Sequence, residues 1–401
     1  MSGGRAETER PQAPAAAATP TATRLVEAAA IAPALRCASE VGGYAWWYAE
    51  VHDPERRYGL TLIVFAGSVF SPRYARLLRR GVPVAGLEVP AVNLALYTRR
   101  DGADWPTAPL GWVMNEHAPA TLRADDVSLA VGASAVRYLP EGGLRFELDE
   151  DTTRFFGRAG ERLTGHITVA APPPPGPALL LGADARGAAH FWQPLCPRST
   201  ADVELQLGPR RIRFRGSAYC DRNYGAGRLE DAFARWGWAH GFATSGAPNG
   251  DGDGNGDGDG NSDGDGDGAA VMIYDALRRD GTRRRIAIRL PGPDRAAEVS
   301  ESVETATEPG SARASGGFFW LRVPPSFGAG PYVCERRPGR AGRLLDAPFY
   351  ARFAARILDT DRPEARYEGV GEYLDLDRFA SRWVQHLLRY KTRHVAARLP
   401  P

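Results

Sequence analysis

Cysteine is scarce in this chain of 401 residues, and its four copies lie far apart. The spacing of Cys37, Cys196, Cys220 and Cys334 matches neither a zinc site nor the framework of a disulfide-rich domain. We therefore expect free thiols in a reducing compartment. Cys220 belongs to the most distinctive motif of the chain, where a small buried hydrophobic side chain is the simplest interpretation of it.

Lysine is almost absent, because Lys391 is the only one among the 50 lysine and arginine residues. The basic and acidic residues nearly balance and leave a formal net charge of +2. This charge gives no reason to expect nucleic acid or another polyanion as a partner. Together with the abundant alanine, glycine and proline, the preference for arginine is typical of a GC-rich genome.

Long apolar runs are also missing, and none approaches the roughly 20 residues that a membrane-spanning helix needs. The N-terminal segment MSGGRAETERPQ is polar, and Glu27 interrupts the alanine-rich run that follows, so we expect no signal peptide. These features predict a cytoplasmic protein. If its substrate is dissolved in lipid, the protein must work at the membrane surface as a peripheral protein.

The motifs of common cofactor-dependent and metal-dependent enzymes are missing too. Gly67-Ser68 and Gly216-Ser217 do not fit the nucleophile elbow G-x-S-x-G, and we find neither a dinucleotide-binding glycine motif nor H-E-x-x-H. The segment 249–268 is almost pure glycine with aspartate and asparagine. It lacks the glutamate and the flanking helices of an EF-hand, so we interpret it as a disordered insertion in a hairpin. We therefore expect chemistry without a metal or an organic cofactor.

Short apolar segments that alternate with turns predict a mostly β protein. Residues 211–215 alternate strictly between arginine and apolar side chains, which is typical of a strand with one buried face. Other segments of strand-like composition are 60–65, 92–97, 144–148, 166–169 and 203–207. Helical periodicity is limited to residues 71–80 and to a predicted C-terminal helix at 377–398.

Two hairpins of similar layout indicate a weak internal repeat. Trp46-Trp47-Tyr48 opens one strand, and a turn at Asp53-Pro54 leads to an apolar strand at Leu60. Trp236-Gly237-Trp238 opens another strand, and a longer excursion leads to the apolar segment 270–274. Each could be the first hairpin of a β-barrel or sandwich unit.

We infer two such units that meet near residues 205–215. The expected organisation is a disordered tail at 1–24, a first β domain at 25–210 and a second β domain at 211–401. The second domain would carry the disordered insertion and the short C-terminal helix.

The most informative stretch is Gly216 to Ala243, GSAYCDRNYGAGRLEDAFARWGWAHGFA. It places a single carboxylate, Asp221, among several aromatic residues. A carboxylic acid shielded from water has a raised pKa and stays protonated near neutral pH, and aromatic faces stabilise a developing cation. The pattern therefore suits chemistry on an apolar substrate. Alternatively, Asp221 and Asn223 could simply hydrogen-bond a turn before Gly225.

The stretch contains Tyr219-Cys220-Asp221, then Asn223, Gly225 and Trp236-Gly237-Trp238. In this order it resembles the signature block of the carotenoid 1,2-hydratases, also called hydroxyneurosporene synthases. Further segments resemble the same family in order, from about residue 41 to about residue 388: 44–48, 65–72, 92–97, 190–194, 348–352 and 372–379. The resemblance implies two lipocalin-like β domains. It also implies hydration, without a cofactor, of the terminal 1,2 double bond of acyclic carotenes such as neurosporene or lycopene.

The resemblance makes Asp221 the acid that protonates the double bond. On a strand, Tyr219 would face the same side as Asp221 and could orient the acid or relay a proton, or it could be an ordinary core tyrosine. His190 and Trp192 match a His-x-Trp element that is linked to activity in the family. His190 could polarise Asp221 or position the water, and Trp192 could face the cation, although a structural role for His190 stays open. The predicted substrate-binding residues are aromatic, and for the tryptophans and Tyr48 a role in the core stays open beside a role in lining a cavity: Trp46, Trp47, Tyr48, Tyr224, Trp236 and Trp238.

Two other functions remain open at this stage. An enzyme on the same fold could guide the cyclisation of a polyene, and a carotenoid or lipid carrier would need a cavity but no acid. The C-terminal segment combines Trp383 and Leu387 with several basic residues, so it could rest on an anionic membrane. A solvated basic face explains this segment equally well.

Overall fold

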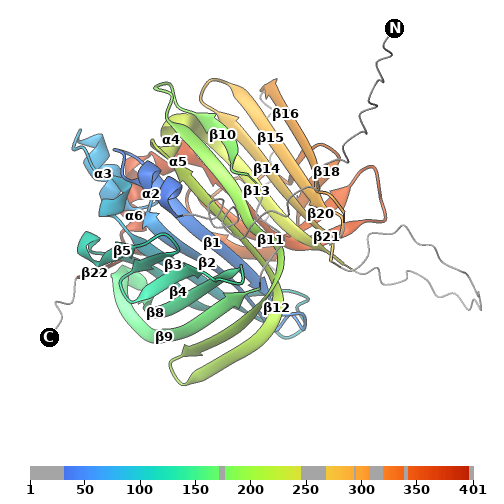
Figure 1. Cartoon of the computed structure of the whole chain (residues 1–401), viewed down its shortest axis with the longest axis horizontal. Helices are drawn as coiled ribbons and strands as arrows, with labels where there is room; N and C mark the ends of the chain where they lie inside the picture. Colours follow the sequence, from blue (N-terminus) through green and yellow to red (C-terminus); the bar gives the residue numbers. More distant parts are fainter. Residues whose placement is uncertain are drawn as a thin grey trace, which may run out of the picture.

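The computed structural model describes residues 31–170, 177–244, 268–292, 295–306, 319–337 and 342–396. The predicted tail at 1–24 lies outside these ranges, as does the predicted insertion apart from its last residue. Within the described ranges the chain is mostly β, as predicted, and its strands form two large sheets (Figure 1).

The first sheet is formed mainly by the N-terminal half of the chain. Its strands are β1 (Tyr44–His52), β2 (Tyr58–Gly67), β3 (Ala91–Arg99), β4 (Pro106–His117), β5 (Leu122–Ala124), β6 (Ser128–Val131), β7 (Ser134–Tyr138), β8 (Leu144–Arg154), β9 (Arg158–Val169), β10 (Leu179–Ala183), β11 (Ala189–Leu207), β12 (Arg210–Gly225) and β22 (Arg393–Val395). They are ordered β22-β4-β3-β2-β1-β12-β11-β9-β8-β7-β6-β5, with β10 beside β11. The pairs are antiparallel except for β22 and β4, which are parallel.

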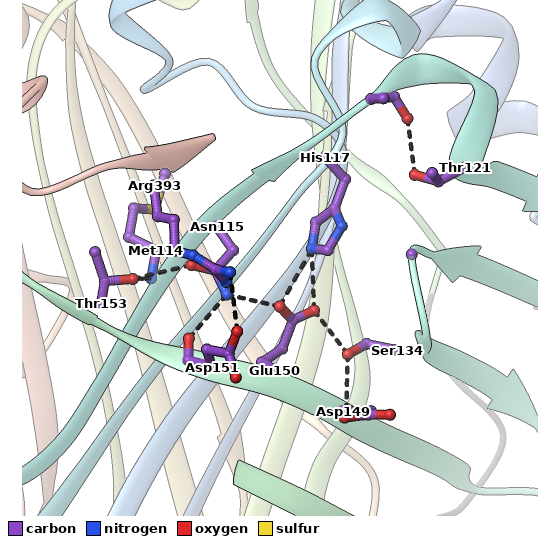
Figure 2. Close-up of polar contacts among 12 residues, drawn as sticks. Met114, Asn115, His117, Thr121, Ser134, Asp149, Glu150, Asp151, Thr153 and Arg393 are labelled. Atoms are coloured by element: carbon purple, nitrogen blue, oxygen red, sulfur yellow. Dashed lines mark hydrogen bonds and ion pairs between the residues drawn. The ribbon is translucent and has the colours of Figure 1, made fainter. Parts of the chain in front are cut away.

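Polar contacts between β4 and β8 draw distant parts of the first sheet together (Figure 2). Asn115 Nδ2 donates a hydrogen bond to Glu150 Oε2 at 2.7 Å, and His117 Nε2 lies 3.1 Å from Glu150 Oε1. The Ser134 hydroxyl of β7 donates to the same carboxylate at 2.8 Å. A buried carboxylate is costly unless it is hydrogen-bonded, so these partners stabilise the curled, barrel-like shape of the sheet.

The second sheet is formed by the C-terminal half. Its strands are β13 (Phe233–Ala243), β14 (Ala270–Arg278), β15 (Thr282–Leu290), β16 (Glu298–Thr305), β17 (Ser326–Ala329), β18 (Tyr332–Arg336), β19 (Arg343–Asp346), β20 (Tyr350–Asp359) and β21 (Arg366–Asp375). They are ordered β16-β15-β14-β13-β21-β20-β18-β17, with β19 beside β20.

Both predicted hairpins form, because β1 pairs with β2 and β13 pairs with β14 in antiparallel register. The chain passes from the first sheet to the second between Gly225 and Phe233. Strand β12, which begins at the boundary predicted near residue 210, therefore still belongs to the first sheet. The C-terminal strand β22 also returns to the first sheet, so the two sheets do not divide the chain at one point.

The helices are few and short. They are α2 (Ala32–Ala38), α3 (Pro72–Arg79), α4 (Leu229–Ala232), α5 (Leu376–Phe379) and α6 (Arg382–Leu388), with 3₁₀ turns η1 (Gly86–Glu88), η2 (Pro119–Thr121) and η3 (Phe155–Gly157). The predicted helix at 71–80 is confirmed as α3, where the Ser71 hydroxyl accepts from Tyr74 N–H at 3.1 Å. Within the described residues, no helix combines the length and the apolar character needed to cross a membrane.

The prediction of a single C-terminal helix was wrong. The segment forms α5 and α6, and the chain then becomes extended in β22, which pairs with β4. The interruption falls at Ser381, whose backbone is extended (φ −73°, ψ 141°). The apolar periodicity of the segment did not reveal this break, and pairing with the edge of a distant strand determines the conformation beyond it.

The alternation of side chains along β1 and β12 produces two separate cores. Trp47 of β1 and Cys220 of β12 pack inside the curled first sheet. Trp46, Tyr48 and Tyr219 point the other way and pack with aromatic residues of the second sheet. Successive side chains of a strand face opposite sides, so one strand serves both cores. The core between the sheets is where the candidate site lies.

Candidate active site

The candidate site is a cavity between the two sheets. Strands β1 and β12 contribute from the first sheet, and β13, β14 and β21 contribute from the second. The lining residues are Trp46, Tyr48, Asp221, Asn223, Trp236, Trp238, Tyr274 and Glu372. The empty volume among them is about 300 Å³, counting the part that is open to solvent. Aromatic rings form most of this lining, and carboxyl groups contribute from both sheets.

Strand register explains why these residues meet. In the pairing of β1 with β12, Tyr48 lies opposite Asp221 and Trp46 lies opposite Asn223. In the pairing of β13 with β21, Trp238 lies opposite Glu372. Directly opposed residues on antiparallel strands share one face of the sheet. Each strand pair therefore presents an aromatic side chain next to a polar one.

Asp221 is buried, and its polar partners are all electrically neutral. The Tyr219 hydroxyl donates to Asp221 Oδ2 at 2.7 Å, and the Trp192 indole N–H donates to the same oxygen at 2.9 Å. Asn223 Nδ2 donates to Oδ1 at 3.2 Å. Burial raises the pKa of the Asp221 carboxyl to about 7, although the hydrogen bonds from Tyr219 and Trp192 act to lower it. A large fraction of Asp221 is therefore protonated at neutral pH.

A second buried carboxylate, Glu50, lies close to this group but has different partners. His52 Nε2 lies 2.5 Å from Glu50 Oε1, and the Tyr48 hydroxyl donates to Oε2 at 3.2 Å. Burial acts to raise the pKa of Glu50, but the charge of His52, the His240 ring 3.8 Å away and the hydrogen bond from His52 outweigh it and lower the pKa to about 2. The His240 ring stacks on Tyr219 with the ring centroids 4.3 Å apart. The two carboxyl groups thus prefer opposite protonation states.

Tyr219 and Trp192 lie where they can orient the acid. The predicted common facing of Tyr219 and Asp221 is observed, because both side chains lie on the same side of β12 and are hydrogen-bonded. Trp192 is fully buried, donates to Asp221, and packs its ring against Tyr274 at 5.3 Å. Trp192 does not line the cavity, so the structure does not place it where it would face the cation. Its observed contact with the site is the hydrogen bond to the acid.

His190 lies on β11 and contacts Tyr44 rather than Asp221. Its Nδ1 is 3.0 Å from the Tyr44 hydroxyl, and its ring also packs against Phe233 at 5.3 Å. In the β11–β12 register His190 lies opposite Gly225, four residues beyond Asp221. Burial lowers the pKa of His190 to about 4, although the charge of Asp184 acts to raise it. His190 is therefore neutral near pH 7, and the suggested direct polarisation of Asp221 is not observed.

Of the predicted substrate-binding residues, Trp46, Tyr48, Trp236 and Trp238 line the cavity. Trp47 and Tyr224 do not, because they lie on the opposite faces of β1 and β12 and pack in the core of the first sheet. The Trp47 indole N–H donates to the Tyr138 hydroxyl at 3.0 Å. The Tyr224 ring stacks on Phe191 with the centroids 5.1 Å apart. Successive side chains of a strand point to opposite faces of the sheet, so the neighbours of lining residues point away from the cavity.

Sequence reasoning missed three residues of the cavity. Asn223 was noted as part of the motif around Asp221 but not as a cavity residue, and the alternative of a turn at these two residues is not observed, because both lie within strand β12. Tyr274 ends a predicted apolar strand, and alternation from that strand could have suggested its facing. Glu372 opens the family-like segment 372–379, but nothing local places it in the cavity, because the register of β21 against β13 brings it there. Within the described ranges, no group of three or more His, Cys, Asp or Glu side chains is arranged to hold a metal ion.

Comparisons with known proteins point to one family. A family model described as "Carotenoid hydratase CrtC" matches residues 62–249 and 262–398. The chain is 30% identical over 359 residues to an acyclic carotenoid 1,2-hydratase from Thiocapsa roseopersicina, covering 88% of this chain and 74% of that protein. It is 26% identical over 321 residues to the enzyme of that name from Rhodobacter capsulatus, covering 79% of this chain and 92% of that protein. A third, from Rubrivivax gelatinosus, is 32% identical over 202 residues, 49% of this chain and 45% of that protein.

Proposed function

Because this chain belongs to the carotenoid hydratase CrtC family of hydro-lyases, we propose that it adds water across the terminal 1,2 double bond of an acyclic carotene. Neurosporene and lycopene are substrates of the right chemistry. The observation that supports the proposal most directly is Asp221, a buried carboxyl with a pKa of about 7 in a cavity of aromatic rings. Hydration of an isolated alkene needs a strong, positioned acid and walls that tolerate a cation.

In the proposed reaction, Asp221 transfers its proton to carbon 2 of the alkene. A tertiary cation forms at carbon 1, and water adds there to give a tertiary alcohol. The rings of Trp46, Trp236 and Trp238 line the same cavity, and the faces of such rings attract a cation. Tyr219 and Trp192 hold the acid through Oδ2, which leaves Oδ1 as the oxygen nearer to Asn223.

The size of the cavity suits the end of a polyene better than its full length. The empty volume of the cavity is only about 300 Å³ even when the space open to solvent is counted. A carotene would therefore insert one terminal group and leave the rest of its chain outside. Such binding accounts for action at a terminal bond, since only the end of the chain reaches Asp221.

His190 fits a positioning role in this proposal. It is fully buried against Tyr44, whose ring stacks on Trp46 with the centroids 4.9 Å apart. Displacing His190 would therefore move an aromatic wall of the cavity without touching the acid. We assign His190 to shaping the cavity, and Tyr219 and Trp192 to holding Asp221.

The test is to express the chain in cells that accumulate lycopene or neurosporene and to analyse the pigments by chromatography with mass detection. We expect more polar pigments, heavier by one or two waters, from the wild type and none from a folded Asp221→Asn variant. A pigment of changed retention but unchanged mass would favour a cyclase. Unchanged pigment that co-purifies with the protein would favour a carrier, whose binding would survive the loss of Asp221.

We also propose that the protein reaches its lipid-dissolved substrate from the membrane surface. Trp383 of α6 is 46% exposed and lies 6.3 Å from the exposed ring of Trp320, measured between ring centroids. The Arg378 guanidinium lies 5.5 Å from the centre of the Trp383 ring. Exposed tryptophan beside a cationic group suits the headgroup region of an anionic bilayer. Co-sedimentation with phosphatidylglycerol vesicles should therefore exceed that with phosphatidylcholine vesicles and weaken in Trp383→Ala, and equal binding to both would contradict the proposal.

A further inference from the structure

We propose that Glu372 is a second catalytic residue, which holds the attacking water together with Trp238 and accepts its proton. This inference rests on the proposed hydration and adds a site for the water, the reactant that Asp221 does not account for. Glu372 lines the same cavity as Asp221 but comes from the opposite sheet, on β21. The acid and the carboxylate therefore approach the cavity from two different sheets.

Glu372 forms an ion pair with a buried arginine. Arg352 of β20 is 1% exposed, and its Nε lies 2.9 Å from Glu372 Oε1. Arg352 also contacts the Thr61 hydroxyl of β2, so the pair is tied to the first sheet. A bound guanidinium fixes the orientation of a carboxylate. The anion is thus positioned before any substrate arrives.

Trp238 supplies the second partner that a bound water needs. It lies directly opposite Glu372 in the pairing of β13 with β21, and it lines the same cavity. Its indole N–H is buried, and no group among the described residues accepts a hydrogen bond from it. A well-held water in a protein usually makes two to four hydrogen bonds. A water that accepts from Trp238 and donates to Glu372 would satisfy both groups.

The other carboxylate nearby is less suited to this task. Glu50 does not line the cavity, and His52 and Tyr48 already engage both of its oxygens. Glu372 also favours the acid step, because after burial itself its negative charge is among the causes that raise the pKa of Asp221. One anion would therefore help to keep the acid protonated and would then deprotonate the water.

Hydration takes place in two steps, protonation of the alkene and capture of the cation by water. The O–H bond of Asp221 breaks, its proton bonds to carbon 2 through the π electrons, and carbon 1 becomes cationic. A lone pair of the water forms the bond to carbon 1, and an O–H bond of that water breaks to leave a protonated Glu372 and a neutral alcohol. Exchange with solvent then removes the proton from Glu372 and returns one to Asp221. The net change is the addition of one water, with no oxidant or reductant.

The experiment measures how the cation partitions in D₂O. Purified full-length protein is incubated with lycopene in detergent, and two quantities are followed by mass detection: hydrated product, and deuterium in the recovered carotene. Deuterium enters when Asp221 delivers it to carbon 2 and the cation then loses a proton instead of capturing water. In Glu372→Gln we expect the ratio of hydration to exchange to fall by roughly 100-fold or more, the usual contribution of a general base. The incorporation of deuterium into the recovered carotene, called exchange here, should persist.

Two further variants keep the test decisive. Trp238→Phe keeps a ring but removes the N–H, and it should lower the same ratio even if Glu372→Gln does not fold. Glu368→Gln is the matched control, because Glu368 is on the same strand and pairs with Arg56 at 2.7 Å and with Arg337, yet it does not line the cavity. Its ratio should equal that of the wild type.

The outcomes separate this inference from the proposed function. Hydration at a wild-type ratio in folded Glu372→Gln overturns the role of Glu372, and so does the loss of hydration and exchange together, since that would place Glu372 in the protonation step. A wild-type protein that neither hydrates nor exchanges refutes the proposed function, and the inference falls with it.

Discussion

Replacing Asp221 with Asn should remove one defined contribution to the dependence of stability on pH. Burial raises the pKa of this carboxyl to about 7, from an ordinary value of 3.8. A group whose pKa is higher in the folded than in the unfolded protein binds more protons in the folded state. The free energy of unfolding therefore falls as the pH rises from about 4 through about 7. Asn cannot titrate, so residue 221 no longer makes the free energy of unfolding fall as the pH rises.

The magnitude follows from the two pKa values. One pH unit corresponds to about 1.4 kcal/mol, so the full loss in the wild type is about 4 kcal/mol. Between pH 5 and pH 8 the same relation gives a loss of roughly 2–3 kcal/mol. The amide oxygen of the new Asn can still accept hydrogen bonds from Tyr219 and Trp192. If the Asn223 amide rotates, its oxygen can accept from the N–H that replaces Oδ1. Shape and hydrogen bonding are thus largely kept, and the charge is the main change.

Urea unfolding at pH 5 and pH 8, followed by tryptophan fluorescence, provides the measurement. The stability of Asp221→Asn relative to the wild type should improve by roughly 2–3 kcal/mol between the two pH values. Asp101→Asn, a change at an exposed position, serves as the control and should show no such trend. An equal difference at both pH values would refute the reasoning, because Asp221 would then be ionised at neutral pH and could not be the acid.

Three other changes test separate parts of the structure. Tyr219→Phe removes a hydrogen bond that lowers the pKa of Asp221, so the fall in hydration rate at high pH should move to higher pH, as initial rates from pH 6 to 9 would reveal. Gly225→Ala would place a Cβ 2.5 Å from His190 Nδ1 and should cost about 1–3 kcal/mol in thermal unfolding, whereas an unchanged melting temperature would contradict this packing. Glu150→Ala leaves the buried donors of the first sheet without their acceptor, and urea unfolding should report a loss of about 3–5 kcal/mol, with a loss below about 1 kcal/mol counting against that role.

The sequence was most predictive where a local pattern carries the information. Strict alternation at 211–215 predicted a strand with one buried face, and Ile212 is buried between exposed arginines. The same period of two placed Tyr219 and Asp221 on one side, and they are hydrogen-bonded. Periodicity at 71–80 likewise predicted the helix α3, whose N-terminus the Ser71 hydroxyl caps.

The remaining features depend on contacts that no local pattern encodes. Trp46, Trp47 and Tyr48 are consecutive aromatic residues on a strand buried on both faces, so hydrophobicity does not reveal which of them faces the cavity. Strand register brings Glu372 beside Trp238, and pairing with β4 keeps the C-terminal segment from continuing as a helix. Such pairings are long-range properties of the fold, which propensity and periodicity do not report.

The partner of each buried carboxyl group explains how one core can hold an acid and anions at once. Asp221 is surrounded by neutral donors, which hydrogen-bond it without supplying a compensating positive charge, so burial dominates and its pKa rises. Glu50 contacts imidazoles, which favour its ionised form, and Glu372 forms an ion pair with the Arg352 guanidinium. Neutral partners for Asp221 come from β11 and β12 of the first sheet, whereas Arg352 and Glu372 come from the second. The packing of the two sheets is therefore what places an acid and an anion around a single cavity, and neither sheet alone provides that combination.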